Sequence, residues 1–214
     1  MFQRVKRPIY RIAPMKTLIM LSGYAQSGKD TIGSHLVNTW GFRRLAFADK
    51  LKDEVSQRYG VKRELMDSGL GKRTQMMVDG SPTTVRDLLV QYGTARRREN
   101  SHYFIEPIID TIHESGSNLV ITDWRYENEY SRIRERFDHQ ELRLIALRIN
   151  RFKTPPYVSE TEIQLDQFSF DVVLNNTGSV KALLRNVDKS LALPPLPVLI
   201  PQSKYSYHLG EFQA

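Results

Sequence analysis

The order of apolar and polar residues predicts a strand followed by a helix, five times along the chain. The first unit opens with Thr17–Ser22 (TLIMLS), an apolar run of strand length that stops at Gly23. From Asp30 to Trp40 the apolar residues recur at helical spacing, and Gly41 closes the pattern. Later apolar runs predict further strands at 44–48, 118–122, 142–149 and 170–174.

Helical spacing fills the stretches between these strands, and this alternation indicates the fold class. We predict an α/β fold, with a five-stranded parallel sheet covered by helices on both faces. Residues 60–82 are polar, hold four glycines and show no clean period, so we expect a mobile loop or a small insert there. The chain then divides into a basic extension (1–14), one domain (15–191) and a proline-rich tail (192–214). The predicted helices follow Asp49 and cover 85–93, 104–112, 126–137 and 180–191.

A glycine-rich loop, SGYAQSGKDT, joins the first strand to the first helix. Gly23-x-x-x-x-Gly28-Lys29 has the spacing of a Walker A loop, in which main-chain N–H groups point at phosphate oxygens. Lys29 would reach the β- and γ-phosphates, and the helix would add the positive end of its dipole. The alternative is a glycine turn with a helix-capping aspartate, which the strand before the loop and the amphipathic helix after it disfavour. We expect ATP to be bound by Gly23, Ser27, Gly28, Lys29, Asp30 and Thr31.

Two aspartates are candidates for binding Mg²⁺, a metal that prefers oxygen ligands. Asp30 stands where a Walker A loop usually has Ser or Thr, and it is able to hold the metal directly or through water. Asp123 follows a buried strand in the Walker B place and should steer Mg²⁺ through water. The sequence therefore predicts an ATP–Mg²⁺ site in which Lys29 and Asp30 take part in catalysis.

An ordered series of motifs resembles the deoxynucleoside monophosphate kinases of large DNA bacteriophages and related bacterial proteins. The resemblance covers roughly residues 15–190 and begins with GKD in place of GK[ST]. This chain departs from the family pattern at Ala95, where an acidic residue is common, at Arg97, where glycine is common, and at Tyr157, where histidine is usual. The later motifs are AFADKLKDEV (46–55), RDLLVQYGTARRR (86–98), VITDWRYENE (120–129), LRINR (147–151), YVSETEI (157–163) and FDVVLNNTGS (170–179).

The resemblance implies a P-loop kinase that transfers phosphate from ATP to a (deoxy)nucleoside 5′-monophosphate. Arg125 would bind the acceptor phosphate or the transferred group. Arg151 would belong to a lid (150–160) that closes over the phosphates, and we prefer it to Arg148, which lies within a strand. The insert at 60–82 would lie on the acceptor side. The other implied acceptor-binding residues are Asp49, Lys52, Gln91 and Arg98.

Several of these residues also have a structural interpretation. Asp49 suits a helix N-cap, and Arg125 suits a surface position at a helix start. Trp124 either stacks on a base or packs in the core. Arg96 and Arg97 are interpreted as solvated charges. Glu129 and Glu160 are candidates for supporting contacts or plain surface charges.

Composition narrows the class of partner. A net charge of +7 and a pI near 9.6 favour an anionic partner, but the scattered basic residues argue against nucleic acid. No apolar window is long enough for a membrane span, and residues 1–14 lack the apolar core of a secretory signal. The absence of cysteine excludes disulfides and fits the cytoplasm, which is the host cytoplasm if the chain is phage-encoded. Five dispersed histidines argue against a zinc site or a Ser-His-Asp hydrolase.

Two other functions stay open at this point. The first is a P-loop kinase of another small phosphorylated acceptor, of the dephospho-coenzyme A or phosphomevalonate type. The second is a non-catalytic nucleotide-binding module, which would not require Arg98, Arg125 and Arg151. The sequence also leaves open a homodimer, the accepted bases and the preference for deoxyribose over ribose.

Overall fold

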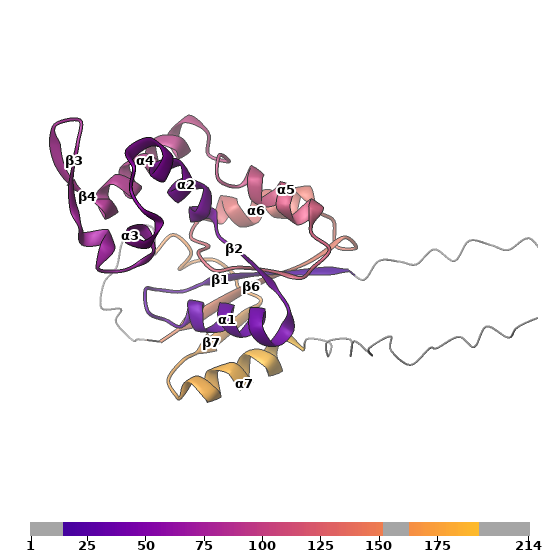
Figure 1. The fold of residues 1–214 in the computed structure, drawn as a ribbon. Coiled ribbons are helices and arrows are strands. Elements are labelled where there is room, and N and C mark those ends of the chain that lie inside the picture. The colour runs from indigo at the N-terminus through magenta and orange to yellow at the C-terminus, as the bar shows by residue number, and fades with distance from the viewer. Residues whose placement is uncertain (1–14, 152–162, 193–214) are drawn as a thin grey trace, which may run out of the picture.

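A central parallel sheet organises the protein. The computed structural model describes residues 15–151 and 163–192. Five strands lie in the order β2-β5-β1-β6-β7, and every neighbouring pair runs parallel. The predicted α/β class with a five-stranded parallel sheet is therefore confirmed (Figure 1). The strands are β1 Lys16–Ser22, β2 Arg43–Leu45, β5 Leu119–Ile121, β6 Leu142–Asn150 and β7 Val172–Asn175.

Helices cover both faces of this sheet because its central strand is apolar on both sides. Ile19 and Leu21 of β1 belong to a core shared with α1 and α7. Leu18 and Met20, which alternate with them, belong to a second core shared with α5 and α6. Figure 1 shows α5 and α6 above the sheet and α1 and α7 below it. These helices are α1 Lys29–Trp40, α5 Glu106–Glu114, α6 Glu127–Arg136 and α7 Val180–Leu191.

A smaller unit of helices and one hairpin stands at the upper left of Figure 1. Its own core contains Val55, Met66, Val85, Leu88 and Leu89. Burial of these side chains gives the unit its stability, as in any small core. Its elements are α2 Phe47–Tyr59, α3 Arg63–Asp67, the 3-10 helix η1 Gly71–Arg73, β3 Gln75–Val78, β4 Ser81–Thr84 and α4 Val85–Glu99.

The segment 60–82 has more regular structure than its sequence pattern predicts. It contains α3, η1, β3 and the start of β4, and Met66 anchors it in the small core. Strands β3 and β4 pair antiparallel across a two-residue turn at Asp79 (φ 50°) and Gly80 (φ 78°). Positive φ at both positions is what a tight hairpin requires.

Two element ends also differ from the pattern. The predicted helix end at Gly93 is wrong, because α4 continues to Glu99. Gly93 is buried inside α4, where a Cβ would make an ordinary contact with Leu51 Cδ2 at 3.4 Å, so this glycine does not end the helix. The strand predicted at 44–48 stops at Leu45, since α2 begins two residues later.

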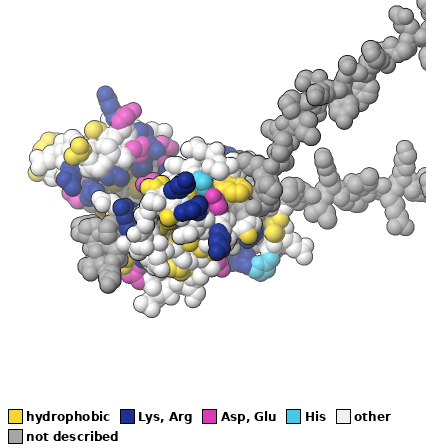
Figure 2. Space-filling view, turned by 90° about the horizontal axis from the view of Figure 1, so that it is seen from below, with side chains coloured by type: hydrophobic (Ala, Val, Ile, Leu, Met, Phe, Trp, Pro, Cys, Tyr) yellow, Lys and Arg dark blue, Asp and Glu magenta, His cyan; other side chains and the backbone are white. Residues whose placement is uncertain are grey.

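Two features bear on membrane and nucleic-acid binding: the length and polarity of the helices, and the distribution of basic side chains on one face. In residues 15–151 and 163–192, every helix is too short or too polar to cross a bilayer. On the face seen in Figure 2, the basic side chains form several separate groups with acidic and apolar side chains between them.

Candidate active site

The loop between β1 and α1 has a conformation that favours glycine at two positions. Gly23 has a φ of 148° and Gly28 a φ of 112°. A Cβ on Gly23 would lie 2.5 Å from the Ile149 carbonyl oxygen, and one on Gly28 would lie 2.9 Å from Asn176 Nδ2. Backbone angle and space therefore both require the two glycines that the Walker A spacing identifies.

Lys29 and Ser27 place polar groups inside the loop. Lys29 Nζ donates to the carbonyl oxygens of Gly23 at 2.5 Å and Tyr24 at 2.9 Å. Ser27 is 1% exposed, and its hydroxyl has no hydrogen-bond partner within the described part of the chain. A buried hydroxyl left without a partner costs free energy, which a phosphate oxygen inside the loop would offset. The loop residues therefore fit the phosphates of a nucleotide.

A buried arginine supports this loop from the sheet. Arg148 of β6 is 6% exposed and donates to Ser22 Oγ at 3.0 Å and to Asp166 Oδ1 at 2.6 Å. Tyr24 of the loop donates its hydroxyl to Asp166 Oδ2 at 2.5 Å, and the Arg148 guanidinium lies 4.9 Å from the centre of the Tyr24 ring. Arg148 thus acts on the loop through Ser22 and Tyr24, from within its strand.

Two further side chains bind carbonyl groups of the loop. Arg151 Nη1 donates to the Gln26 carbonyl oxygen at 3.0 Å. Asn176 Nδ2, beyond the end of β7, donates to the Ser27 carbonyl oxygen at 2.9 Å. Arg151 therefore lies beside the phosphate loop, while the rest of the predicted lid, at 152–160, lies outside the described residues.

The loop opens into a depression at the carboxyl ends of β1 and β5. Ligands of parallel α/β sheets collect at such an edge. Three residues predicted from the sequence, Lys29, Asp123 and Arg125, are brought together here. The full lining is Ser22, Gly23, Lys29, Asp123, Trp124, Arg125 and Leu165.

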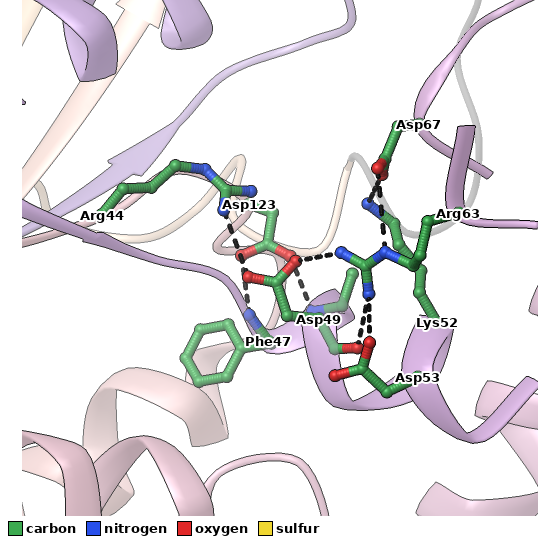
Figure 3. A network of polar contacts seen from close by, with 9 residues as sticks. Arg44, Phe47, Asp49, Lys52, Asp53, Arg63, Asp67 and Asp123 are labelled. Atoms are coloured by element: carbon green, nitrogen blue, oxygen red, sulfur yellow. Dashed lines mark hydrogen bonds and ion pairs between the residues drawn. The ribbon is translucent and has the colours of Figure 1, made fainter. Parts of the chain in front are cut away.

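Asp123 faces this depression and also caps helix α2. Its carboxylate accepts the main-chain N–H groups of Phe47 at 3.0 Å and Ala48 at 2.9 Å (Figure 3). Burial raises the pKa of Asp123 above its ordinary value, and these two hydrogen bonds oppose the rise. Because each carboxylate oxygen already accepts one bond, the geometry suits a contact with Mg²⁺ through water.

Asp30, the other predicted magnesium ligand, lies away from that depression. It is exposed in the first turn of α1, next to the half-buried Thr31, and lines a separate groove with Val37 and Arg44. Within residues 15–151 and 163–192, no three His, Cys, Asp or Glu side chains form a metal-binding group. Mg²⁺ bound with a nucleotide needs only one or two carboxylates besides the phosphates. Asp123 lines the depression and would supply one of them, whereas Asp30, the other predicted ligand, lines the separate groove.

Asp49 and Lys52 take part in a network of ion pairs around α2 (Figure 3). Asp49 accepts from Arg63 Nη2 at 2.9 Å and from Arg44 Nη1 at 3.1 Å. Lys52 Nζ donates to Asp67 Oδ1 at 2.6 Å. Asp49 lies inside α2 and not at its N-cap, so the alternative interpretation as a cap is wrong.

Lys72 of η1 lies within reach of positive charges from α2, α4 and the turn after β5. Lys72 of η1 is half-buried and forms no ion pair within the part of the chain that the structure describes. Its pKa is lowered by burial and then by the positive charges of Lys52, Arg86 and Arg125, whereas Asp67 acts in the opposite direction. We call Lys52, Lys72, Arg86 and Arg125 the cation cluster. Sequence analysis missed Lys72 and Arg86, because only the packing of separate elements brings them together.

Other candidates lie elsewhere. Gln91 and Arg98 are exposed on α4 and do not line the depression. Arg97 is not the solvated charge that the sequence predicts, because its Nη2 lies 3.7 Å from the carboxylate of the buried Glu129. Trp124 is 2% exposed and packs against three neighbouring aromatic rings, so it belongs to the core.

The chain was compared with known families, curated proteins and solved structures, and the similar solved structures include kinases. No protein-family model matches the chain, and no curated protein matches it. Three kinases are among the solved structures that are similar to this chain at low sequence identity. The shikimate kinase from Aquifex aeolicus vf5 has 14% identity and a TM-score of 0.48, with 82% of this chain and 96% of that chain covered. The gluconokinase from Sinorhizobium meliloti 1021 has 12% identity and a TM-score of 0.45, with 84% and 93% covered. The APS kinase CysC Cys556Ala mutant from Mycobacterium tuberculosis has 12% identity and a TM-score of 0.44, with 84% and 99% covered.

Proposed function

We propose that the protein is a nucleoside monophosphate kinase, which transfers the γ-phosphate of ATP to a (deoxy)nucleoside 5′-monophosphate. The observation that carries this proposal is a pair of groups of basic side chains that share Arg125. Lys29 of the phosphate loop belongs to the first group, and Arg125 lines the same depression. The cation cluster is the second, and the charge of Arg125 acts on Lys72 within it.

The charge of the cluster favours a phosphorylated acceptor. Lys52, Arg86 and Arg125 surround Lys72 with positive charge, and Asp67 is the carboxylate that offsets part of it. A half-buried lysine among like charges costs stability unless an anion joins it. A phosphate monoester carries roughly −1.5 to −2 at pH 7, and so matches the excess charge better than a single carboxylate or an alcohol.

The chemistry follows from positions and charges. Phosphoryl transfer needs donor and acceptor in line, with positive charge around the transferring group. Lys29 would stay with the γ-phosphate during transfer, and Arg125 would offset the charge that develops between donor and acceptor. Mg²⁺, when bound, would neutralise charge on the phosphates, and Asp123, which lines the depression, would hold it through water.

The nucleoside part of the proposal rests on the ordered motifs. The segment RDLLVQYGTARRR contributes Arg86 to the cation cluster and continues along α4 through Gln91 to Arg98. In the resembling family this segment lies on the acceptor side. The preference for deoxyribose rests on the same resemblance.

A panel of acceptors tests the proposal. ADP release is measured with ATP and Mg²⁺ against all common ribo- and deoxyribonucleoside monophosphates, dephospho-coenzyme A and phosphomevalonate. We expect turnover with at least one deoxynucleoside monophosphate and little ADP without an acceptor. Turnover only with a non-nucleotide acceptor would assign the site to another phosphorylated substrate. ATP binding without transfer to any acceptor would make the chain a nucleotide-binding module.

The same assay tests the cation cluster through Lys72→Met. Loss of this cation is expected to raise the KM for the monophosphate about 10- to 100-fold, as for a lost charged hydrogen bond, with the KM for ATP unchanged. The matched control is Arg73→Met, which removes an exposed charge from the same 3-10 helix and should change neither constant. Equal behaviour of the two variants would remove Lys72 from the acceptor site.

A further inference from the structure

Glu129 is a buried carboxylate that binds the main chain of the turn carrying Arg125. It lies in the first turn of α6 and is 2% exposed. Its Oε2 accepts the N–H of Arg125 at 3.0 Å and the N–H of Tyr126 at 3.2 Å. Charge-assisted bonds of this kind are stronger than bonds between neutral groups. The carboxylate therefore fixes two consecutive peptide groups beside the depression.

The same turn is fixed on its other side by Trp124. The Trp124 indole is buried among aromatic rings and donates Nε1–H to the Tyr126 carbonyl oxygen at 2.8 Å. Arg125 thus lies between one residue anchored in the core and another held by Glu129. Its side chain leaves the turn at the edge of the depression. A displacement of this turn would move the Arg125 guanidinium relative to the phosphates.

Arg97 connects this turn to α4. Its Nη2 lies 3.7 Å from Glu129 Oε1, the oxygen that does not bind the turn. The Arg97 guanidinium lies 4.8 Å from the centre of the Phe104 ring and 4.7 Å from the centre of the Tyr126 ring. Such contacts hold a planar cation in place at little cost in side-chain freedom. Arg97 is therefore a fixed positive charge beside a buried carboxylate.

Opposing effects act on the pKa of Glu129. Burial raises the pKa of Glu129 from near 4.5 to about 7, and the negative charge of Asp123 contributes to the rise. The N–H groups of Arg125 and Tyr126 and the positive charge of Arg97 lower the pKa. Without Arg97 the carboxylate would hold its proton to a higher pH.

We propose that Glu129 is a positioning residue for Arg125, and that Arg97 pairs with the second oxygen of the Glu129 carboxylate from helix α4. This inference rests on the proposed function, because Arg125 is the group that meets the transferring phosphate there. The proposal also gives Arg97 a role, because its side chain extends from α4 to the turn that carries Arg125.

The test compares Glu129→Ala with Glu129→Gln in the acceptor assay. The alanine variant loses both turn bonds, and we expect kcat to fall at least tenfold while the KM for ATP stays the same. The glutamine variant keeps an oxygen that can accept those bonds but loses the negative charge, and we expect its kcat at pH 8 to lie between those of Glu129→Ala and wild type. Glu127→Ala, an exposed residue of the same helix turn, is the matched control and should behave as wild type.

Stability separates positioning from folding in these variants. The folded-state pKa of Glu129 is raised, so its contribution to stability is complete below pH 4.5 and is lost as pH rises through about 7. Glu129→Gln should therefore unfold at the same or a higher temperature than wild type at pH 8. Thermal unfolding of Glu129→Ala reports the fraction folded, to which its kcat is normalised.

A pH profile tests the part assigned to Arg97. In Arg97→Met, Glu129 should keep its proton to a higher pH, so the fall of kcat toward acid pH should begin at a higher pH than in wild type. Glu129→Gln has no carboxyl group to protonate at this position, so the part of that fall caused by Glu129 should be absent. Wild-type kcat in Glu129→Ala, or an unshifted limb in Arg97→Met, would overturn the inference. Absence of transfer by the wild type itself would instead overturn the proposed function, so the two failures are distinct.

Discussion

Replacement of Lys29 by alanine is expected to abolish phosphate transfer while leaving the fold intact. The ammonium group lies across the loop, on the carbonyl oxygens of Gly23 and Tyr24, where the phosphates of ATP are proposed to bind. Among the described residues, Lys29 is the lysine that lines the depression. We expect kcat to fall by at least about 1,000-fold, as for loss of a group that stabilises the transition state.

The measurement is ADP release with the best acceptor, together with thermal unfolding. Lys29 is half-buried and its bonds are to loop carbonyls, so the variant should unfold within a few degrees of wild type, as roughly expected for loss of about 1 kcal/mol. Lys189→Ala, at an exposed position in the last turn of α7, is the control and should keep full activity. Retention of a near-normal rate by Lys29→Ala would contradict the assigned role.

Replacement of Arg125 by alanine is expected to lower kcat about 100- to 1,000-fold, because its guanidinium would stabilise charge that develops only during transfer. The KM for ATP should change little, since the phosphate loop stays complete. Arg125 is exposed at the end of the turn that follows β5, so the substitution removes no part of the core.

Two further variants test this prediction. Arg125→Lys keeps the charge but not the two-pronged geometry, and it should recover only part of the lost rate. Arg136→Ala removes an exposed arginine from the last turn of α6 and should be silent. A loss in Arg125→Ala that appears only as a higher KM for ATP would place the side chain on the donor and not on the transferring group.

The main sheet could be predicted from the sequence because its signals are local. A strand buried on both faces, such as β1, is a continuous apolar run, and the amphipathic helices around it repeat their own period. The phosphate loop is local as well. Gly23, Gly28 and Lys29 lie within seven consecutive residues, and the two glycines adopt the positive φ values that favour glycine.

The small unit could not be predicted in the same way. Its core joins Val55 of α2, Met66 of α3 and Val85 of α4, which lie far apart in the chain. Each of its middle elements is five residues or shorter, so none is long enough to show a period. Gly93 misled because a glycine is also tolerated inside a helix, and α4 continues through it to Glu99.

The residues that support the site could not be identified from the sequence, because tertiary packing brings them together. Arg148 appeared in the sequence as a charge within a strand, yet its partner Asp166 lies 18 residues away and completes the support of Tyr24. Arg97 and Glu129 stand 32 positions apart, and nothing in either motif indicates that they meet. Sequence patterns find residues that act through the local backbone, whereas pairs formed by packing need the structure.

The most direct test of the central claim is a crystal structure with a non-hydrolysable ATP analogue and a deoxynucleoside monophosphate bound together. We predict the analogue's phosphates inside the loop at 23–29, within hydrogen-bond distance of Lys29. The monophosphate should lie with its phosphate between Arg125 and Lys72. A structure with an empty loop, or with the monophosphate bound away from Arg125, would contradict the account.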